Sequence, residues 1–152
     1  MDFKDLKVYI ENSVIGGYFD DEFSEPTKML FELFRQGLYK PVISGHVITE
    51  LDDGAPEHVK NILKTINYSE YDVTEEMEML AQKYIDAKIL TENYSDDALH
   101  IAVATIVEVD LLVSWNFKHI VNYNRIQQFN ATNVREGYKP LEIRTPKELI
   151  LL

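Results

Sequence analysis

Three acidic side chains stand where the sequence predicts a costly place for a charge. Glu11 ends an apolar run, Glu50 precedes Leu51 on a predicted helix, and Asp97 begins a helix whose Ile101 shares its face. A carboxylate beside a buried stripe costs on the order of several kcal/mol unless a partner compensates it. Few lysines or arginines lie near these acids in the sequence. One divalent cation would compensate all three, and hard cations such as Mg²⁺ and Mn²⁺ prefer carboxylate and water ligands.

Each acid taken singly has a simpler role. Glu11 can cap a helix, Glu50 can be a solvated helix residue, and Asp97 can interact with the helix dipole. Their shared placement at strand ends and helix starts favours a common role instead. Two divalent ions about 3.5–4 Å apart can activate a water and stabilise the leaving oxygen of a phosphodiester. Metal-assisted phosphodiester hydrolysis is therefore the chemistry that this set of acids favours.

Short apolar runs alternate with helical patterns along the chain. The predicted strands are 7–11, 41–44, 68–73, 111–114 and an edge strand at 141–144. The predicted helices are 12–19, 24–37, 45–51, one from about 57, and one each after Thr74, Ser95 and Thr145. Strands separated by helices are typical of βαβ units and a mostly parallel sheet, so we expect one α/β/α domain over residues 1–152. Sites in such folds form beyond the carboxyl ends of the strands.

Polar residues before the apolar patterns predict where helices begin. Asn12 or Ser13 is expected to cap the first helix, and Ser95 the helix that carries Asp97. Thr145–Glu148 is a capping box with proline at the first helical position, which is a strong local helix start.

Composition narrows the class of protein. The chain has 152 residues, 45% of them hydrophobic, and no cysteine. A metal would therefore use oxygen or imidazole ligands.

Residues 1–5 carry charges where a signal peptide has an apolar core, and no apolar run approaches the roughly 18 residues of a membrane helix. A cytoplasmic protein is expected. The net charge of −11 and the lack of a dense basic run predict weak non-specific DNA binding, although bound cations reverse the local field for a phosphodiester.

Three histidines lie near these segments, two of them at helical spacing from one of the acids. His46 is four residues before Glu50 and could share a metal ion with it, but a hydrogen-bonded or surface role is favoured. His100, three residues after Asp97, is interpreted as a packed helix residue. His119 is expected to hydrogen-bond near the loop after the fourth strand.

Aromatic side chains near the predicted edge of the sheet could stack on a nucleic-acid base. They are Tyr18, Phe19 and Trp115. Core packing is favoured for Phe19, and both roles stay open for Trp115.

Four segments resemble, in order, the motifs of PIN-domain nucleases. They are Val8–Ile15, Val42–Leu51, Asp97–Ala102 and Leu112–Ile120, and the tail from 137 to 149 is similar to a bacterial VapC-like branch of that family. The resemblance covers nearly the whole chain, and its third and fourth motifs together are the most specific. It implies a three-layer α/β/α fold with about five strands and ribonuclease activity that depends on Mg²⁺ or Mn²⁺.

The resemblance also implies which residues form the site. The catalytic residues and metal ligands would be Glu11, Glu50, Asp97 and Asn116, and the residues beside them would be Ser13, Asp96 and Ser114. Glu11 and Asn116 stand where the family usually has Asp. The longer Glu11 shifts the ion or the backbone, and the amide of Asn116 can ligate Mg²⁺ but removes a full negative charge. A weaker second metal site is therefore expected.

The resemblance further implies partners and a biological class. These are an RNA substrate, a small antitoxin protein, a homodimer, and the role of toxin in a type II toxin–antitoxin pair. The alternative is a PIN-like protein-binding module in which Asn116 has weakened or ended catalysis. A phosphoacceptor signalling domain would require an acid pair after the first strand, which Glu11-Asn12 lacks.

Overall fold

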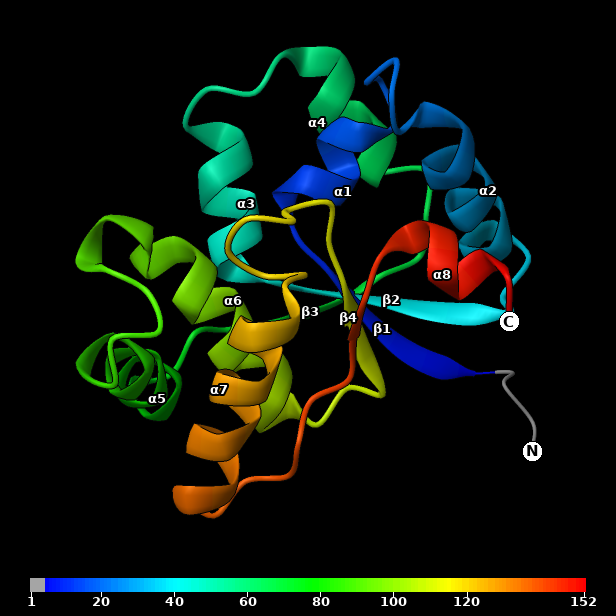
Figure 1. Ribbon diagram of the computed structural model, residues 1–152. Coiled ribbons are helices and arrows are strands. Elements are labelled where there is room, and N and C mark those ends of the chain that lie inside the picture. The colour runs from blue at the N-terminus through cyan, green and yellow to red at the C-terminus, as the bar shows by residue number, and fades with distance from the viewer. Residues whose placement is uncertain (1–4) are drawn as a thin grey trace.

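Five parallel strands form the centre of the fold, in the order β3-β2-β1-β4-β5 (Figure 1). The structure is a computed structural model that describes residues 5–152, so residues 1–4 of the charged start lie outside the described residues. The strands are β1 (Leu6–Ile10), β2 (Tyr39–Ser44), β3 (Ser69–Tyr71), β4 (Leu111–Val113) and β5 (Ile143–Arg144).

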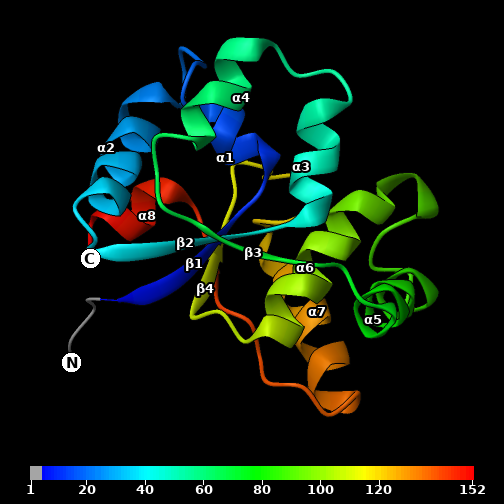
Figure 2. The same cartoon turned by 180° about the vertical axis from the view of Figure 1, so that it is seen from behind.

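Helices cover both faces of this sheet (Figures 1 and 2). They are α1 (Asn12–Gly17), α2 (Ser24–Arg35), α3 (Gly45–Asp52), α4 (Glu57–Leu63), α5 (Glu75–Asp86), α6 (Ser95–Val107), α7 (Tyr123–Arg135) and α8 (Pro146–Ile150), with a 3₁₀ turn at Glu92–Tyr94. Helices α1, α2, α4 and α8 lie on one side, and α5, α6 and α7 on the other. The predicted three-layer α/β/α fold is confirmed. No helix within residues 5–152 is both long enough and apolar enough to span a membrane.

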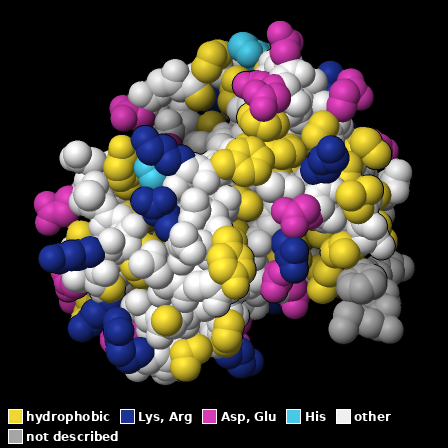
Figure 3. Space-filling view, viewed as in Figure 1, with side chains coloured by type: hydrophobic (Ala, Val, Ile, Leu, Met, Phe, Trp, Pro, Cys, Tyr) yellow, Lys and Arg dark blue, Asp and Glu magenta, His cyan; other side chains and the backbone are white. Residues whose placement is uncertain are grey.

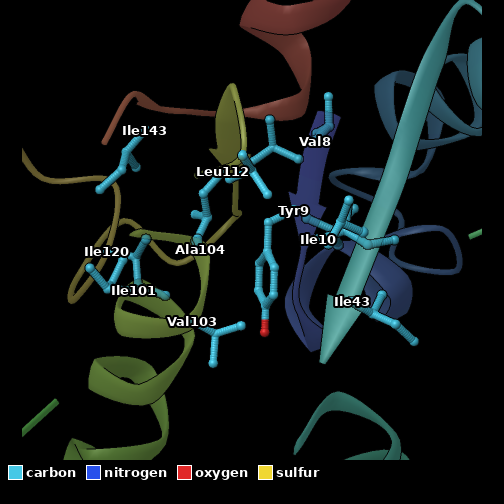
Figure 4. Packing of buried hydrophobic residues seen from close by; sticks show 14 of the residues in the cluster. Val8, Tyr9, Ile10, Ile43, Ile101, Val103, Ala104, Leu112, Ile120 and Ile143 are labelled. Atoms are coloured by element: carbon cyan, nitrogen blue, oxygen red, sulfur yellow. The ribbon is translucent and has the colours of Figure 1, made fainter. Parts of the chain in front are cut away.

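The central strands are buried on both faces, which explains their continuous apolar runs. Val8, Tyr9 and Ile10 of β1 are fully buried, and so are Leu112 and Val113 of β4. Figure 4 shows the Tyr9 ring extending from β1 toward α6 among the apolar side chains of the core. Strand register places Ile10 directly beside Val113. The residues that follow β1 and β4 therefore leave the sheet at the same edge.

The order of the strands reverses beside β1. The chain runs outward from β1 through β2 to β3, then crosses back through α5 and α6 to β4 on the other side of β1. Ligand sites in open α/β sheets form in the crevice at such a reversal, outside the carboxyl ends of the strands. The first strand and the strand that begins the second half thus define where a site can form.

Two predicted caps differ from the structure. The N-cap of α1 is Glu11, whose side chain accepts the backbone N–H of Ser13, so neither Asn12 nor Ser13 caps this helix. Ser95 lies inside α6, because the preceding 3₁₀ turn leads directly into the helix and leaves no extended residue at its start. The Thr145–Glu148 capping box is confirmed.

Helix α7 is an element that the sequence pattern does not predict. Its buried face includes Phe129 but also the polar Thr132 and Asn133. Asn133 donates to Thr105 at 3.3 Å and contacts Tyr84, so this face is satisfied by hydrogen bonds to α5 and α6. Asparagine, glutamine, arginine and threonine make up most of this helix, so few apolar residues mark it as an element that packs on the core.

Gly17 allows α1 to pack directly against the indole of Trp115. A Cβ at Gly17 would lie 2.8 Å from Trp115 Cδ1, whereas a Cβ at Gly16 would meet nothing within 4 Å. We expect Gly17→Ala to destabilise the protein by about 1–3 kcal/mol through overpacking. Gly16→Ala should stabilise it by about 0.5–1 kcal/mol, because glycine is unfavourable in a helix. Urea unfolding measures both, and equal midpoints for the two variants would contradict the packing assignment.

Candidate active site at the carboxyl edge of the sheet

Glu11 is a buried carboxylate at the end of β1, with 5% of its surface exposed. Its Oε2 accepts the N–H of Ser13 at 3.0 Å, and its Oε1 accepts the Ser13 hydroxyl. Burial raises the pKa of Glu11, and the charge of His100 and the Ser13 hydrogen bonds offset this only in part. No lysine or arginine within residues 5–152 forms an ion pair with Glu11. A bound cation would compensate the negative charge of a buried acid that lacks such a partner.

Ser13 connects the end of β1 to the end of β4. Its hydroxyl oxygen accepts the backbone N–H of Trp115 at 2.9 Å and lies 3.4 Å from the Ser114 hydroxyl. The Ser114 hydroxyl in turn accepts the N–H of Asn116 at 2.9 Å. The two serines named beside the predicted site thus hold its first and fourth segments together.

Glu50 reaches the same edge from α3, the helix that follows β2. Its Oε1 lies 2.7 Å from His100 Nε2 and 3.4 Å from His46 Nε2. Burial raises the pKa of Glu50, but the hydrogen bond and charge of His100, with the charge of His46, outweigh it and leave the pKa below its usual value. Glu50 is therefore an ionised acid beside two imidazoles.

Asp97 lies in the first turn of α6, as predicted. Its Oδ2 accepts from Asn116 Nδ2 at 3.4 Å and lies 3.1 Å from His119 Nδ1. Burial raises the pKa of Asp97, the charges of His100 and His119 lower it, and the charge of Glu50 raises it further. The pKa of Asp97 is therefore above its usual value. Because the charge of Glu50 contributes to this rise, Glu50 and Asp97 interact electrostatically.

Asn116 presents an amide nitrogen, not an oxygen, to Asp97. Its Oδ1 accepts the backbone N–H of His119 at 2.9 Å, which sets the orientation of the amide. The position of the fourth acid therefore supplies a donor that holds Asp97. The predicted hydrogen bonding of His119 in this loop is also present, because its ring contacts Asp97.

His100 is buried but is not only a packing residue. The Tyr9 hydroxyl lies 2.7 Å from its Nδ1 and 2.9 Å from Ser44 Oγ, while its Nε2 contacts Glu50. Burial raises the pKa of Tyr9, so the hydroxyl stays protonated. The signal in the sequence was the spacing of three residues from Asp97, which places both side chains on one face of a helix.

The structure brings some predicted residues closer together than others. Among residues 5–152, the side chains that place ligand atoms within 4.8 Å of one another are His46, Glu50 and His100. Glu11, Glu50 and Asp97 do not form so tight a group. Mg²⁺ keeps several waters and often takes only one or two carboxylates directly, so binding of this ion does not require three acids in so tight a group. Asp96 is largely exposed, and its Oδ1 lies 2.9 Å from His46 Nε2.

The structure places Trp115 in the core and Phe19 at the surface. Trp115 is 8% exposed, stacks on Phe23 with ring centroids 4.4 Å apart, and donates to Thr27 Oγ1 at 2.9 Å, so it belongs to the core. The core assignment of Phe19 is wrong, since 42% of its surface is exposed. Helix α1 ends at Gly17, and Phe19 lies in the turn beyond it.

One face of the molecule carries surface charges of both signs. Figure 3 shows acidic and basic side chains interspersed, with apolar side chains between them, on the face seen in Figure 1. An extensive basic surface is not present on this face.

Comparisons with known proteins identify the fold. No protein-family profile matches the sequence. No curated protein has significant sequence similarity to it. A chain of VapBC2 from Rickettsia felis, solved bound to a DNA fragment from their promoter, superposes with a TM-score of 0.60 over 92% of this chain and 98% of that chain, at 13% identity. VapC20 of Mycobacterium tuberculosis, a Sarcin-Ricin loop cleaving toxin, superposes with a TM-score of 0.56 over 74% of this chain and 92% of that chain, at 15% identity.

The chain has a VapC-like PIN-domain fold. The resemblance inferred from the four motifs is thus confirmed at the level of the fold. The edge that carries Glu11, Glu50 and Asp97 lies at the carboxyl ends of the strands, where the strand order reverses beside β1.

Proposed function

We propose that the protein is a metal-dependent endoribonuclease and the toxin of a type II toxin–antitoxin pair. One observation carries the proposal: acids from three distant segments lie at the carboxyl edge of a VapC-like sheet, and Glu11 among them is buried without an ion pair to a lysine or arginine of residues 5–152. The VapC20 likeness supports RNA as the substrate class.

The acids are proposed to hold Mg²⁺ or Mn²⁺, with Glu11, Glu50 and Asp97 as ligands. When bound, such an ion makes water a better nucleophile at neutral pH and offsets charge on the phosphate oxygens. Ser13 and Ser114 hold Glu11 and its loop in place, and His119 orients Asp97. Both acids with raised pKa must lose their protons to bind a cation, so metal affinity should fall as pH is lowered.

Asn116 enters the proposal chiefly as the residue that orients Asp97. Its Oδ1 already accepts the His119 N–H, which leaves one lone pair for a metal ion. This arrangement favours a single strongly held ion over two. It is also the observation that supports the second candidate, a PIN-like protein-binding module with weak or no catalysis.

Metal removal tests the proposed activity. Purified protein is mixed with short end-labelled RNAs, single-stranded and stem-loop, in Mg²⁺, in Mn²⁺ or in EDTA. We expect cleavage with either ion, none in EDTA, and recovery when Mn²⁺ is added in excess. Cleavage that persists in EDTA would contradict the metal assignment. Absence of cleavage under every condition would favour the binding module.

The proposed partners are a small antitoxin protein and a second copy of the chain. The likeness to a chain of the VapBC2 complex supports the first. Co-purification of the product of an adjacent small gene with tagged protein tests it, and light scattering of the isolated protein tests the homodimer. A monomer that copurifies with nothing would count against both partners.

A further inference from the structure

Two imidazoles and one carboxylate converge beside the proposed hydrolytic site. Glu50 Oε1 lies 2.7 Å from His100 Nε2 and 3.4 Å from His46 Nε2, and all three atoms lie within 4.8 Å of one another. In a tetrahedral zinc site with bonds of about 2.1 Å, neighbouring ligand atoms are about 3.4 Å apart. The observed spacing therefore suits one ion with small side-chain movements.

Helices α3 and α6 place these three side chains next to one another. His46 and Glu50 are four residues apart on α3, which places them on one face of that helix. His100 reaches them from α6, with its Nδ1 2.7 Å from the Tyr9 hydroxyl. Histidines that bind metals characteristically donate their other ring N–H to such a partner. Without a metal, His100 Nε2 shares a proton with Glu50 Oε1. A bound metal ion would replace that proton, with Nδ1 then donating to the Tyr9 hydroxyl and Tyr9 to Ser44.

His46 supplies the second independent observation. Its Nε2 is buried yet has no hydrogen-bond partner within residues 5–152. Asp96 Oδ1 is 2.9 Å away and Glu50 Oε1 3.4 Å away, but neither is placed as a hydrogen-bond acceptor for this nitrogen. Buried ring nitrogens are nearly always hydrogen-bonded, so one that lies close to two carboxylate oxygens without a directed hydrogen bond points to a bound cation.

We propose that His46, Glu50 and His100 form a site for one borderline transition-metal ion, with Zn²⁺ as its representative. Imidazole nitrogen favours Zn²⁺ over Mg²⁺, whereas the all-carboxylate set of the proposed hydrolytic site favours the harder ions. Glu50 belongs to both sets, so Zn²⁺ at this site withdraws it from the hydrolytic site and inhibits RNA cleavage. The binding site stands on its own geometry, and only this inhibition rests on the proposed function.

Zn²⁺ binding to metal-free protein tests the site. Isothermal titration calorimetry of the whole chain is expected to show one Zn²⁺ per protein. Removing a ligand in His46→Gln should weaken binding by more than about tenfold, since even residues that only support ligands change metal affinity 10–100-fold. His58→Gln, at an exposed histidine outside the cluster, serves as the matched control and should bind as the wild type does. His46 makes no hydrogen bond through Nε2, so its variant should fold normally.

The outcomes separate this site from the proposed function. Asp97→Asn should keep Zn²⁺ binding, because Asp97 is not a ligand here, while His46→Gln should cleave RNA in Mn²⁺ and resist inhibition by Zn²⁺. Wild-type affinity in His46→Gln, or no Zn²⁺ binding by the wild type, would overturn the site whatever the cleavage assay shows. Zn²⁺ binding in a protein that never cleaves RNA would uphold the site and leave only the nuclease proposal refuted.

Discussion

Replacing Asp97 with asparagine should lower Mn²⁺-dependent RNA cleavage by about 10²-fold or more. Even residues that only support metal ligands change affinity or activity 10–100-fold, and a direct ligand should matter at least as much. Asparagine keeps the shape of the side chain and an oxygen that can accept from Asn116 Nδ2 and contact His119 Nδ1. The variant should therefore fold, and its loss of activity should reflect the missing charge. Initial rates of cleavage at saturating Mn²⁺ give the measurement.

Asp53→Asn is the matched control for this experiment. Asp53 is exposed at the end of α3, so the same chemical change occurs away from the acids. It should leave the cleavage rate unchanged. Wild-type activity in Asp97→Asn would remove Asp97 from the metal site and with it the central part of the proposed function.

Replacing Glu11 with glutamine should make the protein more stable in EDTA and abolish its stabilisation by metal. Burial raises the pKa of Glu11 in the folded state. The folded protein then binds the proton more tightly than the unfolded chain, so wild-type stability falls as pH rises above the usual carboxyl pKa. Glutamine carries no charge and removes this loss. Its amide can still partner Ser13, whose hydroxyl is free to rotate.

Glu11→Gln should raise stability without metal but remove the added stability that metal gives, and these opposite effects can be measured separately. Thermal unfolding between pH 5 and pH 8 in EDTA should show a higher Tm for the variant, with the difference growing as pH rises through the raised pKa of Glu11 and staying constant above it. A site that binds Mn²⁺ should add about 2.7 kcal/mol of stability to the wild type at a hundredfold excess over Kd, and little to the variant. Glu25→Gln, an exposed acid in the first turn of α2, controls for loss of a charge near a helix start. A metal-induced rise in Tm that is equal in Glu11→Gln and the wild type would exclude Glu11 as a ligand.

Most strands and helices could be predicted from the sequence, because their formation depends on residues that are close together in the chain. Runs such as Val8–Ile10 are apolar at every position since both faces of a parallel strand are covered, and the Thr145–Glu148 box is a local hydrogen-bonding motif. Helix α7 was not readable, because Asn133 satisfies its buried face through Thr105 and Tyr84, residues distant in sequence.

The sequence by itself determined the order of the strands along the chain and hence the edge of the sheet at which Glu11, Glu50 and Asp97 lie, because parallel strands place their carboxyl ends on one side. Only the tertiary structure decided what each side chain meets there. In the folded chain the Asn116 amide donates to Asp97, and His100 contacts both Tyr9 and Glu50. The Nε2 of His46 makes no hydrogen bond within residues 5–152. Periodicity tells which face of an element a residue occupies, whereas hydrogen bonds between segments 50 or more residues apart depend on how the whole core packs.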